Sequence, residues 1–385
     1  MKNSYTAARQ CFFALFISAC LTGYSQALTT EFQNAGYTLL DLGSIDQLPS
    51  RYGGLTIRPD QPNTLYIGGY ANEGQGNIYT VGLVRDAVTH HVTGFDGAAS
   101  LFVAAPNNDG GIFFAPNGTL LFTRYSMNHL GQVLPDNSYV TTPLTDFGIA
   151  SSVGSIILVP AGYPGAGNLI VASYNGAILY NVPYTIDGSG LYILSNKAAE
   201  VSVVGVANGP EGIAYIPAGS LAFPNLSMAV SSYGDGNVMV FEVGADGLPI
   251  VSTARQMVTG LTGAEGALID PVTGDFLFST FGGGDKVIRI SGFEAPSAIG
   301  DKPAGLHAGF TLTPNPTEGP VKIEIAESGD EGCYEIYNTL GERVNYQVFS
   351  GDGIYEFDLS DQPDGMYIVR VQNGETVMSR KIVKN

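Results

Sequence analysis

Three acidic side chains stand beside glycines at the start of apolar segments. Glu211 lies in Gly209-Pro210-Glu211-Gly212, Glu265 lies in the similar Gly263-Ala264-Glu265-Gly266, and Asp109 precedes Gly110-Gly111. Carboxylate oxygens are the ligands that hard cations such as Ca²⁺ prefer. If the fold gathers these three residues, they predict a calcium site. The alternative is structural, with the glutamates accepting backbone N–H bonds where strands begin.

A second set of residues offers ring stacking and positive charge. Aromatic side chains end strand-like segments at matching places in the chain: Tyr70, Tyr125, Tyr174, Tyr233 and Phe281. Such a series either stacks on a ligand ring or packs neighbouring structural units together. Arg124 either orients a ligand carboxylate or pairs with Asp109. The predicted ligand-binding residues are Arg51, Tyr52, Arg124, Tyr125, Tyr174 and Tyr233.

Other chemistries find no support in the sequence. It has no Gly-x-Ser-x-Gly elbow, Walker loop, Rossmann glycine fingerprint or His-Glu-x-x-His, so the catalytic residues, if there are any, are unknown. No Cys/His cluster has the spacing of a zinc site. The formal net charge is −18. Since binding to phosphates needs clustered Lys and Arg, a nucleic-acid partner is not expected.

A repeat explains how the acidic and aromatic residues are positioned. Five segments share a Gly start, four or five mostly apolar residues and a Pro turn: 52–59, 109–116, 152–160, 209–217 and 263–271. A repeat of about 40–50 residues built of short strands is typical of β-propeller blades. Residues 37–293 therefore predict an all-β, five-bladed propeller. Six blades remain open, since the wider spacings leave room for a degenerate blade.

The propeller prediction places the chemistry at one mouth of a central channel. Residues just before the innermost strands would form a ring there, holding Arg51 and Tyr52, Asp109, Ser152, Glu211 and Glu265. The last repeat lacks a fourth strand, and residues 37–45 precede the first repeat as an unassigned strand. We expect this strand to complete the last blade and close the ring, because closure removes exposed sheet edges.

The first 27 residues predict an export signal. Lys2 and Arg9 precede a short apolar core, and Ser25-Gln26-Ala27 resembles a small-x-small cleavage site. The core is too short for a transmembrane helix, and none is expected elsewhere. The alternative is a lipobox at 17–20, which would leave Cys20 as a lipidated N-terminus.

The C-terminal part has a different texture. Residues 294–308 form a linker rich in Pro, Gly and Ala, and seven short alternating segments follow in 309–385. They predict a small seven-stranded, Ig-like β-sandwich. Four motifs, at 313–319, 334–344, 359–371 and 379–384, resemble the type A C-terminal sorting domain of the type IX secretion system. The resemblance implies the type IX secretion machinery as a partner and passage through the periplasm to the cell surface or the medium.

The propeller part also resembles known families, namely gluconolactonase/senescence-marker-type and NHL-like propellers. The first of these implies a calcium-dependent site with a glutamate at the channel. Two hypotheses follow. The protein is a secreted or surface propeller that binds an unknown extracellular ligand or partner, or it is a calcium-dependent lactonase- or esterase-like hydrolase. Calcium ligation requires Asp109, Glu211 and Glu265 to converge within about 5 Å.

Overall fold

The computed structural model describes residues 26–220, 222–293, 310–325, 332–338, 343–351, 353–373 and 376–385. The chain divides into two compact units, at residues 1–296 and 297–385. Most of the expected export signal, with Cys20, and the whole of the expected linker 294–308 lie outside the described residues.

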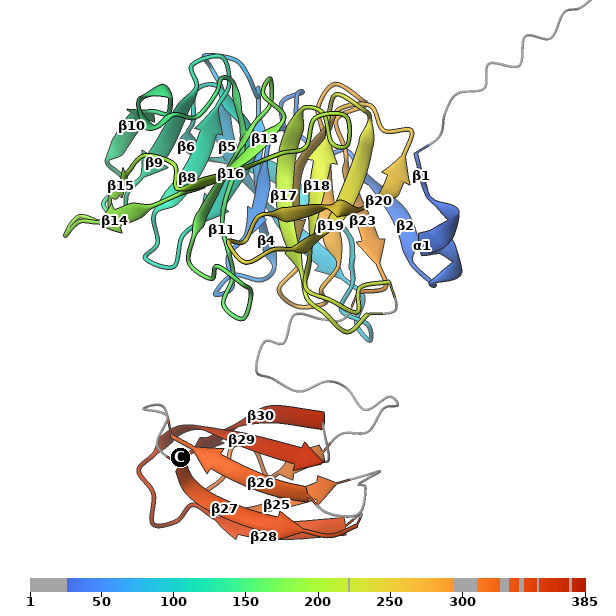
Figure 1. Cartoon of the computed structure of the whole chain (residues 1–385), viewed down its shortest axis with the longest axis vertical. Helices are drawn as coiled ribbons and strands as arrows, with labels where there is room; N and C mark the ends of the chain where they lie inside the picture. The colour runs from blue at the N-terminus through green and yellow to red at the C-terminus, as the bar shows by residue number, and fades with distance from the viewer. Residues whose placement is uncertain are drawn as a thin grey trace, which may run out of the picture. The chain divides into compact units, whose positions relative to one another are not determined.

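Antiparallel sheets of four or five strands build the first unit (Figure 1). In order from the innermost strand, sheet 1 is β3 (Leu55–Ile57), β4 (Thr64–Gly69), β5 (Asn77–Arg85) and β6 (Val92–Ala104). Sheet 2 is β7 (Asn108–Phe114), β8 (Leu120–Arg124), β9 (His129–Val133) and β10 (Tyr139–Pro143), followed by the 3-10 helix Thr145–Phe147. Sheet 3 is β11 (Val153–Leu158), β12 (Leu169–Ser173), β13 (Ile178–Val182) and β16 (Ala199–Ser202). The hairpin β14 (Tyr184–Ile186) and β15 (Tyr192–Leu194) is inserted before β16.

The last two sheets both take strands from the start of the chain. Sheet 4 is β17 (Pro210–Ile216), β18 (Ser227–Ser232), β19 (Asn237–Val243) and β20 (Pro249–Thr259), with β1 (Ala27–Leu28) added outside β20. Sheet 5 is β21 (Ala264–Ile269), β22 (Phe276–Thr280), β23 (Val287–Ser291) and β2 (Thr38–Gly43). Helix α1 (Thr30–Asn34) connects β1 to β2.

The innermost strands close into a ring, which makes the fold propeller-like. Each of β3, β7, β11, β17 and β21 contacts the next, and β21 contacts β3. The expected closing strand is present, because β2 pairs antiparallel with β23. No pattern in the sequence predicts β1 and α1. They bring Phe32 into an aromatic cluster with Phe223, beside sheet 4.

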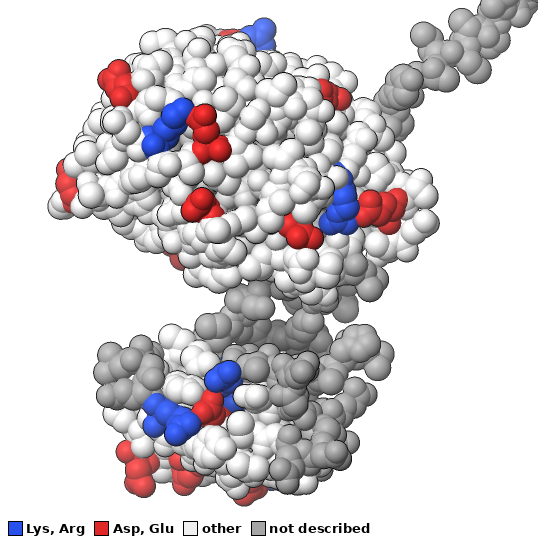
Figure 2. Space-filling model, viewed as in Figure 1, with Lys and Arg blue, Asp and Glu red and all other residues white. Residues whose placement is uncertain are grey.

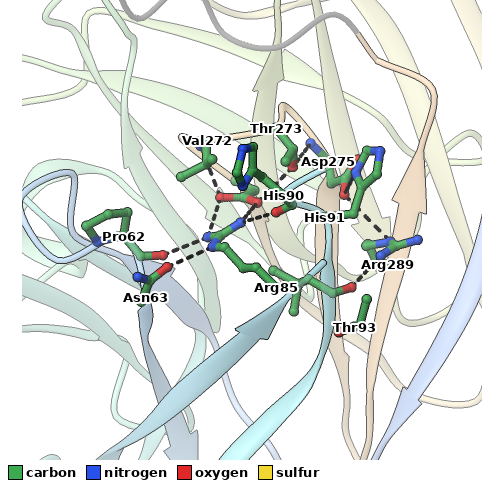
Figure 3. Close-up of polar contacts among 12 residues, drawn as sticks. Pro62, Asn63, Arg85, His90, His91, Thr93, Val272, Thr273, Asp275 and Arg289 are labelled. Carbon is green, nitrogen blue, oxygen red and sulfur yellow. Dashed lines mark hydrogen bonds and ion pairs between the residues drawn. The ribbon is translucent and has the colours of Figure 1, made fainter. Parts of the chain in front are cut away.

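A second link joins the first and last sheets beyond the strand pairing. The β5–β6 hairpin of sheet 1 reaches the β21–β22 turn of sheet 5, where Arg85 binds Asp270 through two hydrogen bonds (Figure 3). Beside this ion pair, His91 Nδ1 lies 2.6 Å from Asp275 Oδ2, and Arg289 of β23 lies 3.6 Å from the same oxygen. The side chains of both aspartates are almost fully buried. The ring is therefore closed by a backbone ladder and by charged side chains.

Glycine at the axis lets the innermost strands come together. A Cβ on Gly154 of β11 would lie 2.1 Å from the carbonyl oxygen of Pro210, and one on Gly212 of β17 would lie 2.4 Å from that of Glu265. Real Cβ atoms do not approach backbone this closely. These glycines are therefore required for close approach of neighbouring strands, as is common at sites where two backbones meet.

The second unit contains two sheets with a shared apolar core. One holds β24 (Phe310–Thr313), β25 (Pro320–Ile325) and β28 (Gly353–Asp358). The other holds β27 (Arg343–Phe349), β26 (Gly332–Tyr337), β29 (Gly365–Asn373) and β30 (Thr376–Lys384). Side chains such as Ile323, Ile336 and Val369 alternate inward and are fully buried, which is the period-2 pattern of strands with one face in a core.

Candidate metal centre at the propeller axis

A bulge at the start of three innermost strands turns an acidic side chain toward the axis. In β17, Pro210 pairs with Ser232 and Ile213 with Val230, so the inner strand carries one extra residue at Glu211-Gly212. The same register shift occurs around Glu265 in β21, and a longer one follows Asp109 in β7. Bulges redirect side chains and are frequent beside functional sites. Here they place one carboxylate from each of three sheets at one end of the ring.

The three carboxylates meet. One oxygen from each of Asp109, Glu211 and Glu265 lies within 4.8 Å of the other two. The residues are 0%, 3% and 1% exposed, respectively. We refer to them as the acidic triad. The sequence-based expectation that these residues converge within about 5 Å therefore agrees with the geometry.

Burial makes the acidic triad costly to ionise. It raises the pKa of each carboxyl well above its ordinary value, and the charge of Asp109 adds to the effect on Glu211 and Glu265. Three carboxylates this close repel one another in a medium that screens weakly. The triad must therefore hold protons or a cation.

Several oxygens of the triad lack hydrogen-bond partners. Both Asp109 oxygens, Glu211 Oε2 and Glu265 Oε1 are buried without a hydrogen-bond partner among the described residues. Buried carboxylates usually accept hydrogen bonds, and the Gly110 N–H favours the charged forms of Asp109 and Glu211. The unpartnered oxygens are therefore free to bind a cation, and strand capping by the glutamates remains the alternative.

Two members of the expected ring are placed differently by the structure. Tyr52 is buried in the core, and its hydroxyl accepts a hydrogen bond from the Ile45 N–H at 2.9 Å. Ser152 precedes the bulge of β11, where the register puts Gly154 at the position of Glu211. In β11 the position equivalent to Glu211 therefore lies two residues after Ser152. In sheets 1 and 3 glycines, Gly53 and Gly154, take the place of the acidic residue.

Aromatic side chains follow the second strands on the same face as the triad. Tyr125, Tyr174, Tyr233 and Phe281 contact one another in series, edge to face, with ring centroids 6.3, 5.9 and 6.1 Å apart. We call these four residues the aromatic arc. Burial, together with the triad's charge, raises the pKa of Tyr174 and Tyr233. Their hydroxyls therefore lie within the electrostatic reach of the carboxylates.

The two expected arginines differ in their surroundings. Arg51 extends the aromatic arc, with its guanidinium carbon 6.0 Å from the Phe281 centroid and an ion pair to Glu73. Arg124 does not pair with Asp109. Its Nε instead donates to the Pro106 carbonyl oxygen at 2.9 Å. The structure thus brings Arg51, Tyr125, Tyr174 and Tyr233 to one face, whereas Tyr52 lies in the core.

One polar residue at the triad was missed by sequence reasoning. Asn72 lies in the loop after β4, and its side-chain amide is close enough to Asp109 to lower the pKa of that carboxyl against the effect of burial. Its position two residues after Tyr70 belongs to no repeat in the other sheets, so periodicity offered no signal.

On the other side of the triad the axis contains a small cavity of about 170 Å³. All five innermost strands line it, mostly with apolar side chains such as Leu55, Ile112, Ile213 and Leu268. Among the described residues, no carboxylate lines this cavity. The acidic triad is thus where charge concentrates on the axis among the described residues.

The fold and this site define an all-β, propeller-like protein with a separate C-terminal β-sheet unit. Residues 311–385 match the model of the secretion system C-terminal sorting domain. This unit directs the chain through the periplasm to the cell surface or the medium, and it implies contact with the secretion machinery. Among the described residues, no helix has the length and apolarity to span a membrane.

Comparison with known proteins adds only distant likenesses for the propeller. No curated protein matches the chain. The PQQ-bound aldose sugar dehydrogenase of Streptomyces coelicolor is 13% identical, with 65% of this chain and 83% of that chain covered and a TM-score of 0.36. A catalytically inactive virginiamycin B lyase of Staphylococcus aureus is 12% identical, with 90% of this chain and 99% of that chain covered and a TM-score of 0.33. An auxiliary nutrient binding protein of Bacteroides thetaiotaomicron is 8% identical, with 66% of this chain and 76% of that chain covered and a TM-score of 0.39. These values support no statement about activity.

Proposed function

We propose that this protein is an exported propeller that binds an extracellular ligand or partner and holds Ca²⁺ in its acidic triad. The five sheets of the first unit would be the blades of a five-bladed propeller. The observation that carries the metal is the convergence of Asp109, Glu211 and Glu265, buried and without hydrogen-bond partners. A calcium ion would neutralise most of their charge and tie three sheets together at one end of the axis.

Ligand spacing is compatible with Ca²⁺. Two ligands of one ion lie at most twice the ion–ligand distance apart, which is about 4.6–5.2 Å for Ca²⁺. The triad's oxygens lie within 4.8 Å of one another, so one Ca²⁺ can contact all three. An all-oxygen set is also unlike the nitrogen and sulfur ligands typical of zinc.

The ligand surface we propose is the face around the aromatic arc. Tyr125, Tyr174 and Tyr233 are half-buried there, and Arg51 supplies a positive charge. The aromatic rings offer stacking area, and the guanidinium can bind an anionic group. Arg124 stays in the proposal as a second cation. Tyr52 does not, because its hydroxyl is bonded inside the core.

The hydrolase alternative is less well supported. A catalytic metal keeps an open position for water or substrate, and the acidic triad is no more than 3% exposed. A closed carboxylate site suits a structural ion better. We therefore place ligand binding at the aromatic arc and assign the cation a role in stability.

The domain organisation we propose follows the predicted boundaries. Residues 1–27 would be the export signal, with lipidation at Cys20 as the alternative. Residues 37–293 would form the propeller, 294–308 the linker, and 309–385 an Ig-like sorting domain. The segment at 28–36, which the prediction left unassigned, would belong with the propeller, because Leu28 of β1 pairs with Val258 of β20.

Calcium titration of the EDTA-treated mature protein by calorimetry tests the metal site. We expect saturable binding and a melting temperature that rises with Ca²⁺, since a ligand bound only by the folded state stabilises it. Glu211→Gln and Glu265→Gln should each abolish most of this rise. Glu200→Gln, at an exposed glutamate paired with Lys197, is the matched control and should leave it intact. Equal melting temperatures in EDTA and in millimolar Ca²⁺ would reject the site.

A further inference from the structure

Asn72 stands beside the acidic triad on a strained loop. Its backbone N–H donates to the carbonyl oxygen of Asn108 at 2.8 Å, which fixes the loop of sheet 1 against the residue preceding Asp109. Its φ is +66°. This left-handed conformation is uncommon for residues other than glycine, although asparagine tolerates it better than most. Strain of this kind concentrates where structure serves a site.

The Asn72 amide has unused bonding capacity inside the protein. Its Oδ1 is buried and has no hydrogen-bond partner among the described residues. The backbone bond to Asn108 holds this loop beside Asp109, and the amide favours the charged form of the Asp109 carboxyl. A buried amide oxygen without a partner is costly, so its retention beside three carboxylates needs an explanation.

We propose that Asn72 supplies a neutral oxygen ligand to the axial cation. This inference rests on the proposed calcium site and deepens it. Calcium takes six to eight oxygen ligands, among them Asn carbonyl oxygens. A neutral ligand adds to the coordination without adding charge to a site that already carries three carboxylates. The two ends of the amide exchange by a half-turn about the last side-chain bond, so Nδ2 can face Asp109 when the site is empty and Oδ1 can face the ion when it is filled.

The variant Asn72→Gly tests whether Asn72 is a metal ligand or serves only the structure of its loop. Asn72→Gly relieves the positive φ and removes the amide, so the EDTA-treated variant should melt at the same temperature as the wild type or higher. Its Ca²⁺ dissociation constant should rise about tenfold or more. Asn107→Gly is the matched control. Asn107 also has a positive φ, +60°, and lies in the neighbouring loop, but it should leave calcium binding unchanged.

The variant Asn72→Asp tests whether the Asn72 amide acts as an oxygen ligand or as a hydrogen-bond donor. An aspartate keeps an acceptor oxygen but cannot donate. If Asn72 ligates the ion, Asn72→Asp should bind Ca²⁺ at least as tightly as Asn72→Gly does, and closer to the wild-type value. If the amide instead serves to donate to Asp109, Asn72→Asp adds a fourth carboxylate and should bind Ca²⁺ more weakly than Asn72→Gly does. That result overturns the proposal.

Calorimetry on the four proteins gives distinct outcomes for the two proposals. If the wild type binds Ca²⁺ and Asn72→Gly binds it with the same affinity, the role of Asn72 is overturned and the calcium site at the acidic triad is retained. Wild type that binds no Ca²⁺ overturns both. Weakened binding in Asn72→Gly, with normal binding in Asn107→Gly and recovery in Asn72→Asp, supports Asn72 as a ligand.

Discussion

Arg85 Nη1 and Nη2 bind the two carboxylate oxygens of Asp270 at 2.6 and 2.9 Å, and this bidentate pair joins the first sheet of the ring to the last. The Asp270 side chain is fully buried and that of Arg85 is 10% exposed. Arg85 also donates to the carbonyl oxygens of Pro62 and His90. Two charges this deeply buried are tolerated because nearly all of their hydrogen-bonding capacity is used.

Removing one partner of this pair should destabilise the ring. Arg85→Met leaves Asp270 buried and unpaired, and we expect a loss of about 3–5 kcal/mol in the free energy of unfolding, measured by urea denaturation. Asp60→Asn breaks the more exposed Arg58–Asp60 pair and should cost no more than about 1 kcal/mol. A similar small loss for both variants would show that the buried pair contributes nothing special to closure.

The stability of the metal-free protein should fall as the pH rises. The carboxyls of Asp109, Glu211 and Glu265 have raised pKa values in the folded state, so the folded protein holds protons that the unfolded chain releases. Their contribution is fully present below the unfolded pKa of about 4 and is lost as the pH rises through the folded values. Melting curves in EDTA from pH 5 to 8 should show this decline, and Glu211→Gln should flatten it. Parallel curves for both proteins would contradict the assignment.

Terbium should report the cation site through the nearby tyrosines. The chain has no tryptophan and has 21 tyrosines. The charge of the triad contributes to the raised pKa of Tyr174 and Tyr233, so both tyrosines lie near it. Terbium bound at the triad should therefore emit when tyrosine is excited, and added Ca²⁺ should displace it. Replacing Tyr174 and Tyr233 by Phe should dim the emission without lowering calcium affinity much. Tyr337→Phe in the C-terminal unit is the control. Undimmed emission from the double variant would place the ion elsewhere.

A methyl group at the axis should be tolerated far less than one at the rim. Gly154→Ala would put a Cβ 2.1 Å from the Pro210 carbonyl oxygen, so neighbouring innermost strands would have to separate. We expect a loss of about 1–3 kcal/mol or more. Gly94→Ala in the outer strand β6 meets no atom within 4 Å and should be neutral within about 0.5 kcal/mol. Equal unfolding midpoints would contradict the close approach.

Export should depend on the C-terminal unit. Deleting residues 309–385 removes the sorting-domain match, and we expect the truncated protein to accumulate in the periplasm of its host. Immunoblots of periplasm, cell surface and medium provide the measurement, with the full chain as control. Truncated protein outside the cell at normal levels would show that the address lies elsewhere.

The sequence was informative where a pattern repeats. Glu211 and Glu265 lie in similar Gly-x-Glu-Gly segments, so one alignment predicted their convergence, and residues 37–45 were recognisable as the strand missing from sheet 5. Bulges made this alignment unreliable. They add residues to innermost strands without changing composition, so the alignment placed Ser152 in the ring where the structure has Gly154. Asn72 belongs to a loop that occurs once, and a single asparagine carries no periodic signal. Its relation to Asp109 arises only from the three-dimensional path of the loop.

The pairing of β2 with β23 also sets the order in which this chain can fold. Thr38 pairs with Ser291, so the ring's last ladder joins residues from opposite ends of the unit and requires nearly all of it to be synthesised first. Non-local pairings of this kind slow folding, because a long loop must close before the contact forms. A chain that folds slowly remains unfolded for longer. For a polypeptide that passes through the periplasm, this delay lengthens the interval in which the unfolded chain can be translocated across a membrane.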